Sequence, residues 1–377
     1  MYMVSCNQKL TEKLNAYKAN AIPAFQSDKW QNGDLYGMSY LPYFRKPHRV
    51  EGTIRPVLCS NGYKINLYAI CDSYLWEFFA SDKFYCGVNK VTIVKTNNKQ
   101  SLKANLDLLK INVLLVEFSE RNVRSILGDT SYVNNLINAQ SEKLKTGTIS
   151  TEILKSNKDK DTFGDKGISS WKFKATSILQ EIKKMKSDVF DFIFNNKINS
   201  NIESNFLDVS LFTPIKEFKS NINYKLFDRV DNYVKVSKDG KQLFYAPTID
   251  TSDWMSSFKS LSDIEKDTLV RRLNRIYIKA KNSGFNKVYL SIIPNPVSII
   301  DPHYDGLVYN DIVNRIQNDK NLKIPYIDVV PTFEVLKSKA YSPSDTHWSQ
   351  FGAHVWLNKF NIELNKTAIE KPVAIKR

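Results

Sequence analysis

Two segments far apart in the chain carry side chains that suit acyl transfer through a serine. An apolar run at residues 64–70 leads into Ser73, and Asp345 stands two residues before His347. A serine hydroxyl is a weak nucleophile unless an imidazole takes its proton, and the imidazole needs an acceptor, usually a carboxylate, to fix its tautomer. The residue types therefore predict a Ser-His-Asp arrangement of Ser73, His347 and Asp345.

The chain holds only four histidines, so few residues could serve as the base. Asp301 and His303 form a second Asp-x-His pair and remain an alternative source of it. His354 follows His347 within the same predicted helical region, which favours a role in packing or capping. His48 lies in a turn-rich segment and is most simply a surface residue.

Three short segments resemble a known family. Residues 345–353, Asp-Thr-His-Trp-Ser-Gln-Phe-Gly-Ala, look like the Asp-x-His-Trp signature of the SGNH-hydrolase-like O-acetyltransferases that modify bacterial polysaccharides, the alginate acetyltransferase group. Residues 71–74, Cys-Asp-Ser-Tyr, are similar to that group's nucleophile motif, with Cys71 where glycine is usual. Residues 115–121 resemble its strand ending in a Glu-x-x-Glu-Arg segment. The resemblance covers about residues 60–125 and 240–360.

The order of the segments differs from that group. Here the serine precedes the Asp-x-His-Trp segment, as in ordinary SGNH esterases, so the blocks are circularly permuted, which the closed geometry of an α/β domain tolerates. The Gly and Asn blocks that name the SGNH family are not plainly present. Gly87, and Asn97 or Asn98, stand at positions that suit oxyanion donors.

The resemblance implies a role for each candidate residue. Ser73 would be the acyl-accepting nucleophile, His347 the general base and then acid, and Asp345 the carboxylate that orients the imidazole. The backbone N–H of Ser73 and a side-chain amide such as Asn97 would hold the oxyanion. For Ser73 the alternative is an ordinary helix N-cap.

Two more residues are candidates for oxyanion or substrate binding. Tyr74 follows the nucleophile directly, and Arg121 lies at the carboxyl end of a strand, where it would organise the site or contact an anionic substrate. The alternative for Arg121 is a salt bridge to Glu117 or Glu120. Trp348 is expected to be structural.

Three functions are open at this point. The first is an O-acetyltransferase that moves an acetyl group through an acyl-serine intermediate onto a cell-envelope or secreted polysaccharide. Its partners would be a polysaccharide or oligosaccharide acceptor and an acetyl donor such as a membrane acetyl-carrier protein. The second is a carbohydrate esterase that uses water as acceptor, which the order of serine before Asp-His favours. The third is a glycan-binding protein without activity. None of these requires a cofactor or a metal.

The elements that must position these residues follow an α/β rhythm. Strands are predicted at residues 64–70, 91–94, 111–116, 287–293 and 324–330, and helices at 100–110, 178–193, 261–282, 311–317 and 349–360. The helix at 261–282 begins after a capping box of Ser262 and Glu265. This pattern argues for a parallel sheet, and with the resemblance it predicts a three-layer SGNH/GDSL-hydrolase-like α/β domain with a helical and strand-containing insertion.

The remaining segments complete one predicted domain over residues 1–377. Its core segments are residues 60–135 and 240–365, and the insertion covers about 140–235, with an exposed loop at 140–170 and a strand-rich part at 200–245. Residues 1–60 are expected to be irregular, with short strands between Gly, Pro and Tyr residues at 20–62.

Composition limits the partners. The chain has 54 Lys plus Arg against 39 Asp plus Glu, a net charge of +15, but this excess is spread along the chain without a concentrated patch. A nucleic-acid site would need such a patch or a recognisable motif, so a solvated surface or an anionic glycan is the better explanation.

The cysteines and apolar segments say little about compartment. The four cysteines are too few for a disulfide framework and lack zinc-site spacing. No stretch of 18 apolar residues is present, so no membrane span is expected. Residues 1–25 have no apolar core like that of a signal peptide, and Met3 to Cys6 match a lipoprotein site only weakly. An extracytoplasmic location, periplasmic or cell-surface, is therefore implied by the resemblance alone.

Overall fold

The computed structural model describes residues 31–46, 64–141 and 209–369. Contacts divide the chain into two compact units, residues 1–28 with 143–214 and residues 29–142 with 215–377. Apart from residues 209–214, the described part of the chain belongs to the second unit. The predicted helix at 178–193 and most of the predicted insertion lie outside the described residues.

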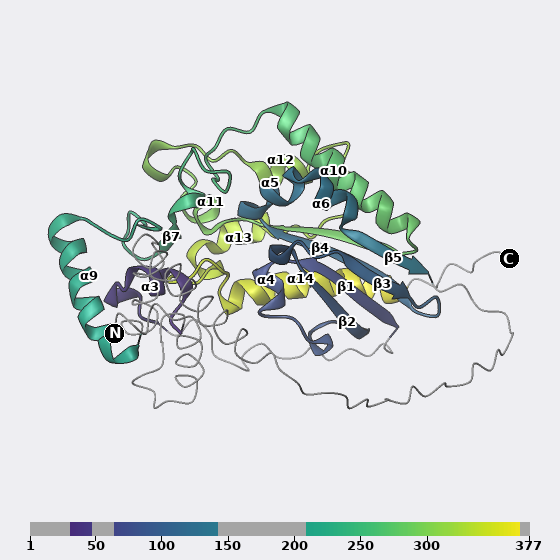
Figure 1. Cartoon of the computed structure of the whole chain (residues 1–377), viewed down its shortest axis with the longest axis horizontal. Helices are drawn as coiled ribbons and strands as arrows, with labels where there is room; N and C mark the ends of the chain where they lie inside the picture. Colours follow the sequence, from purple (N-terminus) through teal and green to yellow (C-terminus); the bar gives the residue numbers. More distant parts are fainter. Residues whose placement is uncertain (1–30, 47–63, 142–208, 370–377) are drawn as a thin grey trace, which may run out of the picture. The chain divides into compact units, whose positions relative to one another are not determined.

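A parallel sheet forms the centre of this unit (Figure 1). Its strands are β1 (Ile65–Cys71), β2 (Val88–Lys95), β4 (Ile111–Ser119) and β8 (Lys287–Ile293), in the order β2-β1-β4-β8. Every residue of β1 and β4 is buried because helices cover both faces of the sheet, and apolar side chains accordingly predominate in both strands. Four of the predicted strands are thus confirmed. The fifth, at 324–330, contributes only a parallel bridge from Tyr326 to Leu290.

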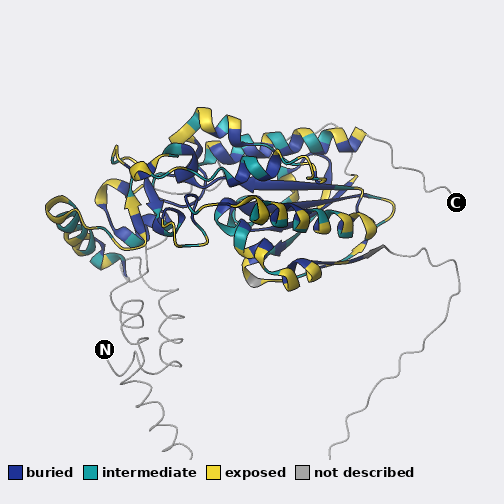
Figure 2. Ribbon diagram, turned by 90° about the horizontal axis from the view of Figure 1, so that it is seen from above, coloured by how far each residue is buried: buried dark blue, intermediate teal, exposed yellow. Residues whose placement is uncertain are grey.

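Helices lie on both faces of the sheet, so the architecture is α/β with a parallel central sheet. α5 (Glu120–Gly128), α6 (Thr130–Asn135), α10 (Asp263–Asn282) and α12 (Ile312–Gln317) gather on one side in Figure 1, and α4 (Ser73–Trp76) and α14 (Gln350–Ile369) on the other. Figure 2 shows the strands buried and the outer faces of the helices exposed.

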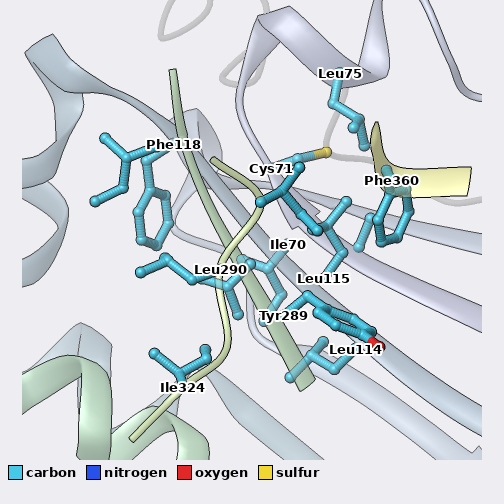
Figure 3. Close-up of a cluster of buried hydrophobic side chains, with 14 of the residues drawn as sticks. Ile70, Cys71, Leu75, Leu114, Leu115, Phe118, Tyr289, Leu290, Ile324 and Phe360 are labelled. Carbon is cyan, nitrogen blue, oxygen red and sulfur yellow. The ribbon is translucent and has the colours of Figure 1, made fainter. Parts of the chain in front are cut away.

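Side chains from both faces of the sheet make one continuous core. Leu115 of β4 is in register with Tyr289 of β8, and on this face Tyr289 packs against Phe360 of α14. The neighbouring residue of β8, Leu290, points to the other face, on the side of Ile324 (Figure 3). The Nε1–H of Trp356 in α14 donates to Ser291 Oγ at 2.9 Å, which fixes α14 on the sheet.

The predicted helix at 100–110 is wrong. Residues 102–106 form β3 (Leu102–Leu106), which pairs in parallel with β5 (Ile137–Ser141) in a separate two-stranded sheet. Leu102 and Leu106 are buried, since residues four apart share one face in a strand as they do in a helix. Leu109, the third residue of the helical pattern, is 88% exposed, and a helix would have buried it with the other two.

Residues 31–46 are also more regular than expected. They form α3 (Asp34–Ser39) and the 3-10 helix η2 (Pro42–Phe44) in place of irregular structure with short strands. Leu35, Tyr36 and Phe44 build a small apolar cluster with the two-stranded antiparallel sheet of β6 (Val234–Val236) and β7 (Leu243–Tyr245). These short strands are the only part of the predicted strand-rich segment that is confirmed among described residues, because α9 (Thr213–Phe227) precedes them.

The other helices agree largely with the sequence pattern. The Oγ of Ser262 accepts a hydrogen bond from the Glu265 N–H at 3.2 Å, as a capping residue of α10 should. Helices α12 and α14 confirm the predictions at 311–317 and 349–360, and α14 continues to Ile369. The remaining helical elements are α11 (Pro296–Ile300), α13 (Val330–Leu336), and the 3-10 helices η3 (Asp82–Phe84), η4 (Thr96–Asn98), η6 (Ser210–Phe212), η7 (Ala246–Thr248), η8 (Tyr304–Gly306) and η9 (Lys337–Ala340).

Two other sequence expectations bear on this part of the chain. Within the described ranges, no helix has the length and apolar character needed to cross a membrane. Cys71 is a buried free thiol, whereas Cys86 is disulfide-bonded.

The close approach of α14 to η9 can be tested at Gly352. A Cβ atom at this position would lie 2.1 Å from the carbonyl oxygen of Ala340, so Gly352→Ala must displace backbone. We expect the substitution to lower the free energy of unfolding by about 1–3 kcal/mol in denaturant titrations. Gly128→Ala is the control, because no atom lies within 4 Å of its added Cβ. Equal losses in the two variants would contradict this packing.

Candidate active site

The sheet order creates a site where the direction of strand addition changes. The chain adds β2 on one side of β1 and then β4 and β8 on the other. In open α/β sheets the loops after such neighbouring strands diverge and leave a crevice at their carboxyl ends, where ligands bind. Here the residues after β1 begin with Asp72 and Ser73, and those after β4 begin with Glu120 and Arg121.

Ser73 is the first residue of α4, and Asp72 is its N-cap. The Oδ1 atom of Asp72 accepts a hydrogen bond from the Tyr74 N–H at 3.1 Å. The alternative that Ser73 caps the helix is therefore wrong. Its half-buried side chain makes a different contact.

Ser73, His347 and Asp345 form one hydrogen-bonded chain. Ser73 Oγ lies 2.7 Å from His347 Nε2, and His347 Nδ1 lies 2.5 Å from Asp345 Oδ1. With the proton on Nδ1, the ring donates to Asp345 and accepts from the Ser73 hydroxyl. His347 and Asp345 are buried. The structure thus brings together the three residues named from the sequence, although Ser73 is 274 residues from His347.

The loop that carries His347 is held at both ends. Its Tyr341 and Trp348 form an antiparallel bridge, and the Ser342 N–H donates to the His347 carbonyl at 3.1 Å. Trp348 is fully buried and packs edge-on against Tyr74, with ring centroids 5.2 Å apart. These contacts fit the expected structural role of Trp348.

Two buried acidic side chains, Asp72 and Glu117, lie next to Ser73. The Asp72 N–H donates to Glu117 Oε2 at 3.1 Å, and Asp72 Oδ2 accepts from the Ser119 N–H at 2.7 Å and from Asn122 Nδ2 at 2.9 Å. Burial raises the pKa of Glu117 well above its usual range, and the adjacent Asp72 charge raises it further. The carboxyl group of Glu117 therefore holds its proton more strongly than a solvated glutamic acid does.

Arg121 and Tyr74 meet at the backbone between Asp345 and His347. Tyr74 OH donates to the Thr346 carbonyl, and Arg121 Nη1 lies 3.4 Å from the same oxygen. The Arg121 guanidinium also lies over the Tyr74 ring, 5.4 Å from its centroid. Burial raises the pKa of Tyr74, so its phenol keeps the proton that it donates.

The alternative of a salt bridge for Arg121 is not seen. Among the described residues, its guanidinium forms no ion pair with Glu117 or Glu120. Glu120 instead accepts from the Asn295 N–H at 2.9 Å and from Ser298 Oγ at 2.8 Å, which fixes the loop after β8.

One acidic residue at the site was not found from the sequence. The Asp34 N–H donates to Asp345 Oδ2 at 2.9 Å, and the Asp34 carboxylate accepts from Thr346 N–H and Oγ1 at 2.8 and 2.5 Å. Burial raises the pKa of Asp34, and the charge of Asp345 raises it further. Its segment has no pattern that points to chemistry, and its partners lie more than 300 residues away.

The other candidates lie apart from this hydrogen-bonded chain. Asn97 is in η4, after β2, and is exposed. His303 is exposed and precedes η8, and His354 Nδ1 lies 2.8 Å from the Gln350 carbonyl within α14, so neither contacts Ser73. His48 lies outside the described residues.

Asp34, Asp345 and His347 could also offer ligands to a metal. One atom from each lies within 4.8 Å of the others. However, the Asp345 oxygens accept from the N–H groups of Asp34 and His347. His347 Nδ1 is hydrogen-bonded to Asp345 Oδ1 and Nε2 to the Ser73 hydroxyl, so a metal at this point would have to replace the contact between His347 and Asp345. The hydrogen bonds suit proton transfer better than metal ligation.

Comparisons with family models, curated proteins and solved structures found nothing that matches this chain.

The raised pKa of Glu117 predicts a specific pH dependence of stability. Because its pKa is raised in the folded protein, the stability it contributes is complete below the ordinary glutamic acid value of about 4.3 and is lost as pH rises through the folded pKa. Glu117→Gln, which cannot titrate but still offers an acceptor to Asp72, should remove this decline. Denaturant titrations across pH would measure it.

Glu334→Gln is the control, because Glu334 is exposed on α13. A difference in unfolding free energy between wild type and Glu117→Gln that stays constant from pH 4 to 9 would contradict a raised pKa at Glu117.

Proposed function

We propose that this chain is a serine-dependent O-acetyltransferase of the SGNH-hydrolase-like class. It would move an acetyl group onto a bacterial cell-envelope or secreted polysaccharide. The hydrogen-bonded chain of Ser73, His347 and Asp345 at the carboxyl end of a parallel sheet carries the proposal. The Asp-Thr-His-Trp segment at 345–348 supports the choice of family.

The first half-reaction forms an acetyl-serine. His347 Nε2 takes the hydroxyl proton as Ser73 Oγ attacks the acetyl carbonyl, and the carbonyl electrons move onto oxygen. When the tetrahedral intermediate collapses, the bond to the donor breaks and the imidazolium returns the proton to the leaving group. Asp345 stabilises the imidazolium and keeps Nε2 aimed at Ser73.

The second half-reaction reverses these roles. A sugar hydroxyl gives its proton to His347 Nε2 and attacks the acetyl carbon, and Ser73 leaves with the proton from the imidazolium. The product is an acetylated sugar, and the free serine is restored. No group beyond donor, acceptor and these three residues is needed to balance protons and electrons.

The oxyanion would be held by donors around Ser73. The Ser73 backbone N–H is one, and the side chains of Asn97, on the β2 side, and Arg121, on the β4 side, are the candidates for a second. Each effective donor accounts for about 10²- to 10³-fold in rate. Arg121 is the better candidate, because it is half-buried beside Tyr74, whereas Asn97 is exposed.

A carbohydrate esterase is the second candidate. The same acetyl-serine would be attacked by water in place of a sugar hydroxyl. The position of Ser73 before Asp345 and His347 in the chain is the order of ordinary SGNH esterases, and it favours this reading. Whether water or sugar reacts depends on how well the crevice binds an acceptor.

An extracytoplasmic location belongs to the same proposal. Disulfides persist in oxidising compartments and are rare in the reducing cytosol, and Cys86 is disulfide-bonded. A polysaccharide acceptor outside the cytoplasm and an acetyl donor at the membrane would both be within reach there.

Incubation with an activated acetyl ester, with and without an oligosaccharide acceptor, tests the proposal. We expect acetyl-Ser73 in the intact-mass and peptide spectra, and acetyl-sugar when the acceptor is present. Fast release of acetate with no acetyl-sugar would leave the esterase, and absence of acetyl-enzyme together with absence of acetate release above the uncatalysed rate would contradict both.

Substitutions of Ser73 and of Asp345 should affect the reaction differently. Ser73→Ala should abolish the acetyl-enzyme, and Asp345→Asn should lower kcat by about 10³- to 10⁴-fold, because the imidazole loses the acceptor that fixes its tautomer. Ser338→Ala, at an exposed serine of η9, is the matched control and should keep wild-type rates. Full activity in Ser73→Ala would refute the assignment of the nucleophile.

A further inference from the structure

Thr346, the residue between Asp345 and His347, has every polar group of its backbone and side chain engaged. Its N–H and hydroxyl donate to the carboxylate of Asp34 at 2.8 and 2.5 Å. Its carbonyl accepts from Tyr74 OH and lies 3.4 Å from Arg121 Nη1. Three segments far apart in the chain thus contact Thr346: Asp34 binds its N–H and hydroxyl, and Tyr74 and Arg121 lie at its carbonyl oxygen.

Asp34 also contacts the carboxylate that orients the imidazole. Asp345 uses Oδ1 for the His347 ring and for the His347 N–H, at 2.5 and 2.9 Å. Its other oxygen, Oδ2, accepts from the backbone N–H of Asp34 at 2.9 Å. Rotation of the Asp345 carboxyl group would break the bond to Asp34, so this bond keeps Oδ1 on the ring.

The backbone before Asp34 is shaped for this contact. Gly33 has a φ of 105°, which side chains other than glycine's rarely allow, and a Cβ there would lie 2.3 Å from the Ser344 carbonyl oxygen. The Tyr36 N–H donates to the same carbonyl at 3.0 Å. The first turn of α3 is therefore pressed against the loop that carries Asp345 and His347.

We infer that Asp34 is a positioning residue for the base: its carboxylate fixes Thr346 and its N–H fixes Asp345, so that the His347 ring stays on Ser73. The inference rests on the proposed function for its effect on rate, but the geometry of the ring can be measured without any substrate. Asp34 contacts neither the nucleophile nor the reacting carbonyl, so it acts only through its two neighbours.

Such a restraint matters because proton transfer from Ser73 to His347 tolerates only small displacements of the ring. The hydrogen bond from Ser73 to Nε2 spans 2.7 Å, and a ring displaced by about 1 Å costs about 10²-fold in rate. In this Asp-x-His loop, the side chains of Asp345 and His347 stay on the same side only as long as the backbone of Thr346 keeps its orientation. The carboxylate of Asp34 accepts both donors of Thr346 and supplies this restraint.

The test uses Asp34→Asn and Thr346→Val in the full chain. Asparagine replaces one acceptor oxygen with a donor, and valine removes only the hydroxyl of Thr346. We expect kcat for the activated acetyl ester to fall by about 10- to 100-fold, with KM within about twofold of wild type. Thr346→Ser keeps the hydroxyl and should restore the wild-type kcat.

A second measurement reads the ring directly. The Nδ1 proton of His347, in its short hydrogen bond to Asp345, should give a low-field proton resonance in the wild type. We expect Asp34→Asn to shift or broaden this resonance, and Asp305→Asn, at an exposed aspartate of η8, to leave it in place. Thermal unfolding of each variant checks that the fold is retained.

The outcomes separate the two ideas. If wild type never forms acetyl-Ser73 but Asp34→Asn still moves the resonance, the proposed function fails and the positioning role stands. If Asp34→Asn and Thr346→Val keep both the wild-type kcat and the wild-type resonance, the inference is overturned. A lower kcat in Asp34→Asn with an unmoved His347 resonance overturns the inference as well. So does a kcat in Thr346→Ser that is as low as in Thr346→Val.

Discussion

The rest of the site depends on one constraint, that a buried imidazole must have partners on both ring nitrogens. His347 has Ser73 on Nε2 and Asp345 on Nδ1, and the two partners lie 274 and 2 residues away. The nearby carboxylate, Asp345, lies in the same loop as His347. The distant hydroxyl, that of Ser73, is positioned by the parallel sheet. β1 ends beside β4 at the point where the strand order reverses, and α14, which begins at Gln350 directly after the His347 loop, is bound to the sheet through Trp356 and Ser291.

The second constraint is electrostatic. Four acidic side chains, Asp34, Asp72, Glu117 and Asp345, are buried or half-buried around the contact between Ser73 and His347. Burial raises the pKa of Glu117 and of Asp34. Each of the four carboxyl groups accepts a backbone N–H: Glu117 from Asp72, Asp34 from Thr346, Asp72 from Ser119 and Asp345 from His347. Arg121 adds a positive charge without an ion pair to Glu117 or Glu120, and its guanidinium lies at the Thr346 carbonyl and over the Tyr74 ring.

These constraints explain which parts could be predicted from the sequence. The strands at 64–70, 111–116 and 287–293 are mostly apolar because both faces are covered, and such runs are visible in the sequence alone. Ser73, His347 and Asp345 followed from the needs of the chemistry and from two short motifs. The helix at 100–110 was wrong because Leu102 and Leu106 share a face in either structure. Asp34 could not be found, since its contacts with Thr346 and Asp345 join residues 312 and 311 positions apart in the chain.

The distance between Asp34 and its partners also bears on how the site is assembled. α3 has an apolar side, with Leu35 and Tyr36 buried against β6 and β7, and its first turn presents Asp34 to the Asp345 loop. Packing of this small cluster therefore determines whether Thr346 is restrained. A chain in which the sheet has formed but α3 has not docked would hold Ser73 and His347 on their own elements without fixing the hydrogen bond between them. The geometry at Ser73 thus depends on the apolar contacts of residues 35–44 as well as on the sheet, so we expect a change in that cluster to lower the rate of the proposed acyl transfer more than it alters the fold of the α/β core.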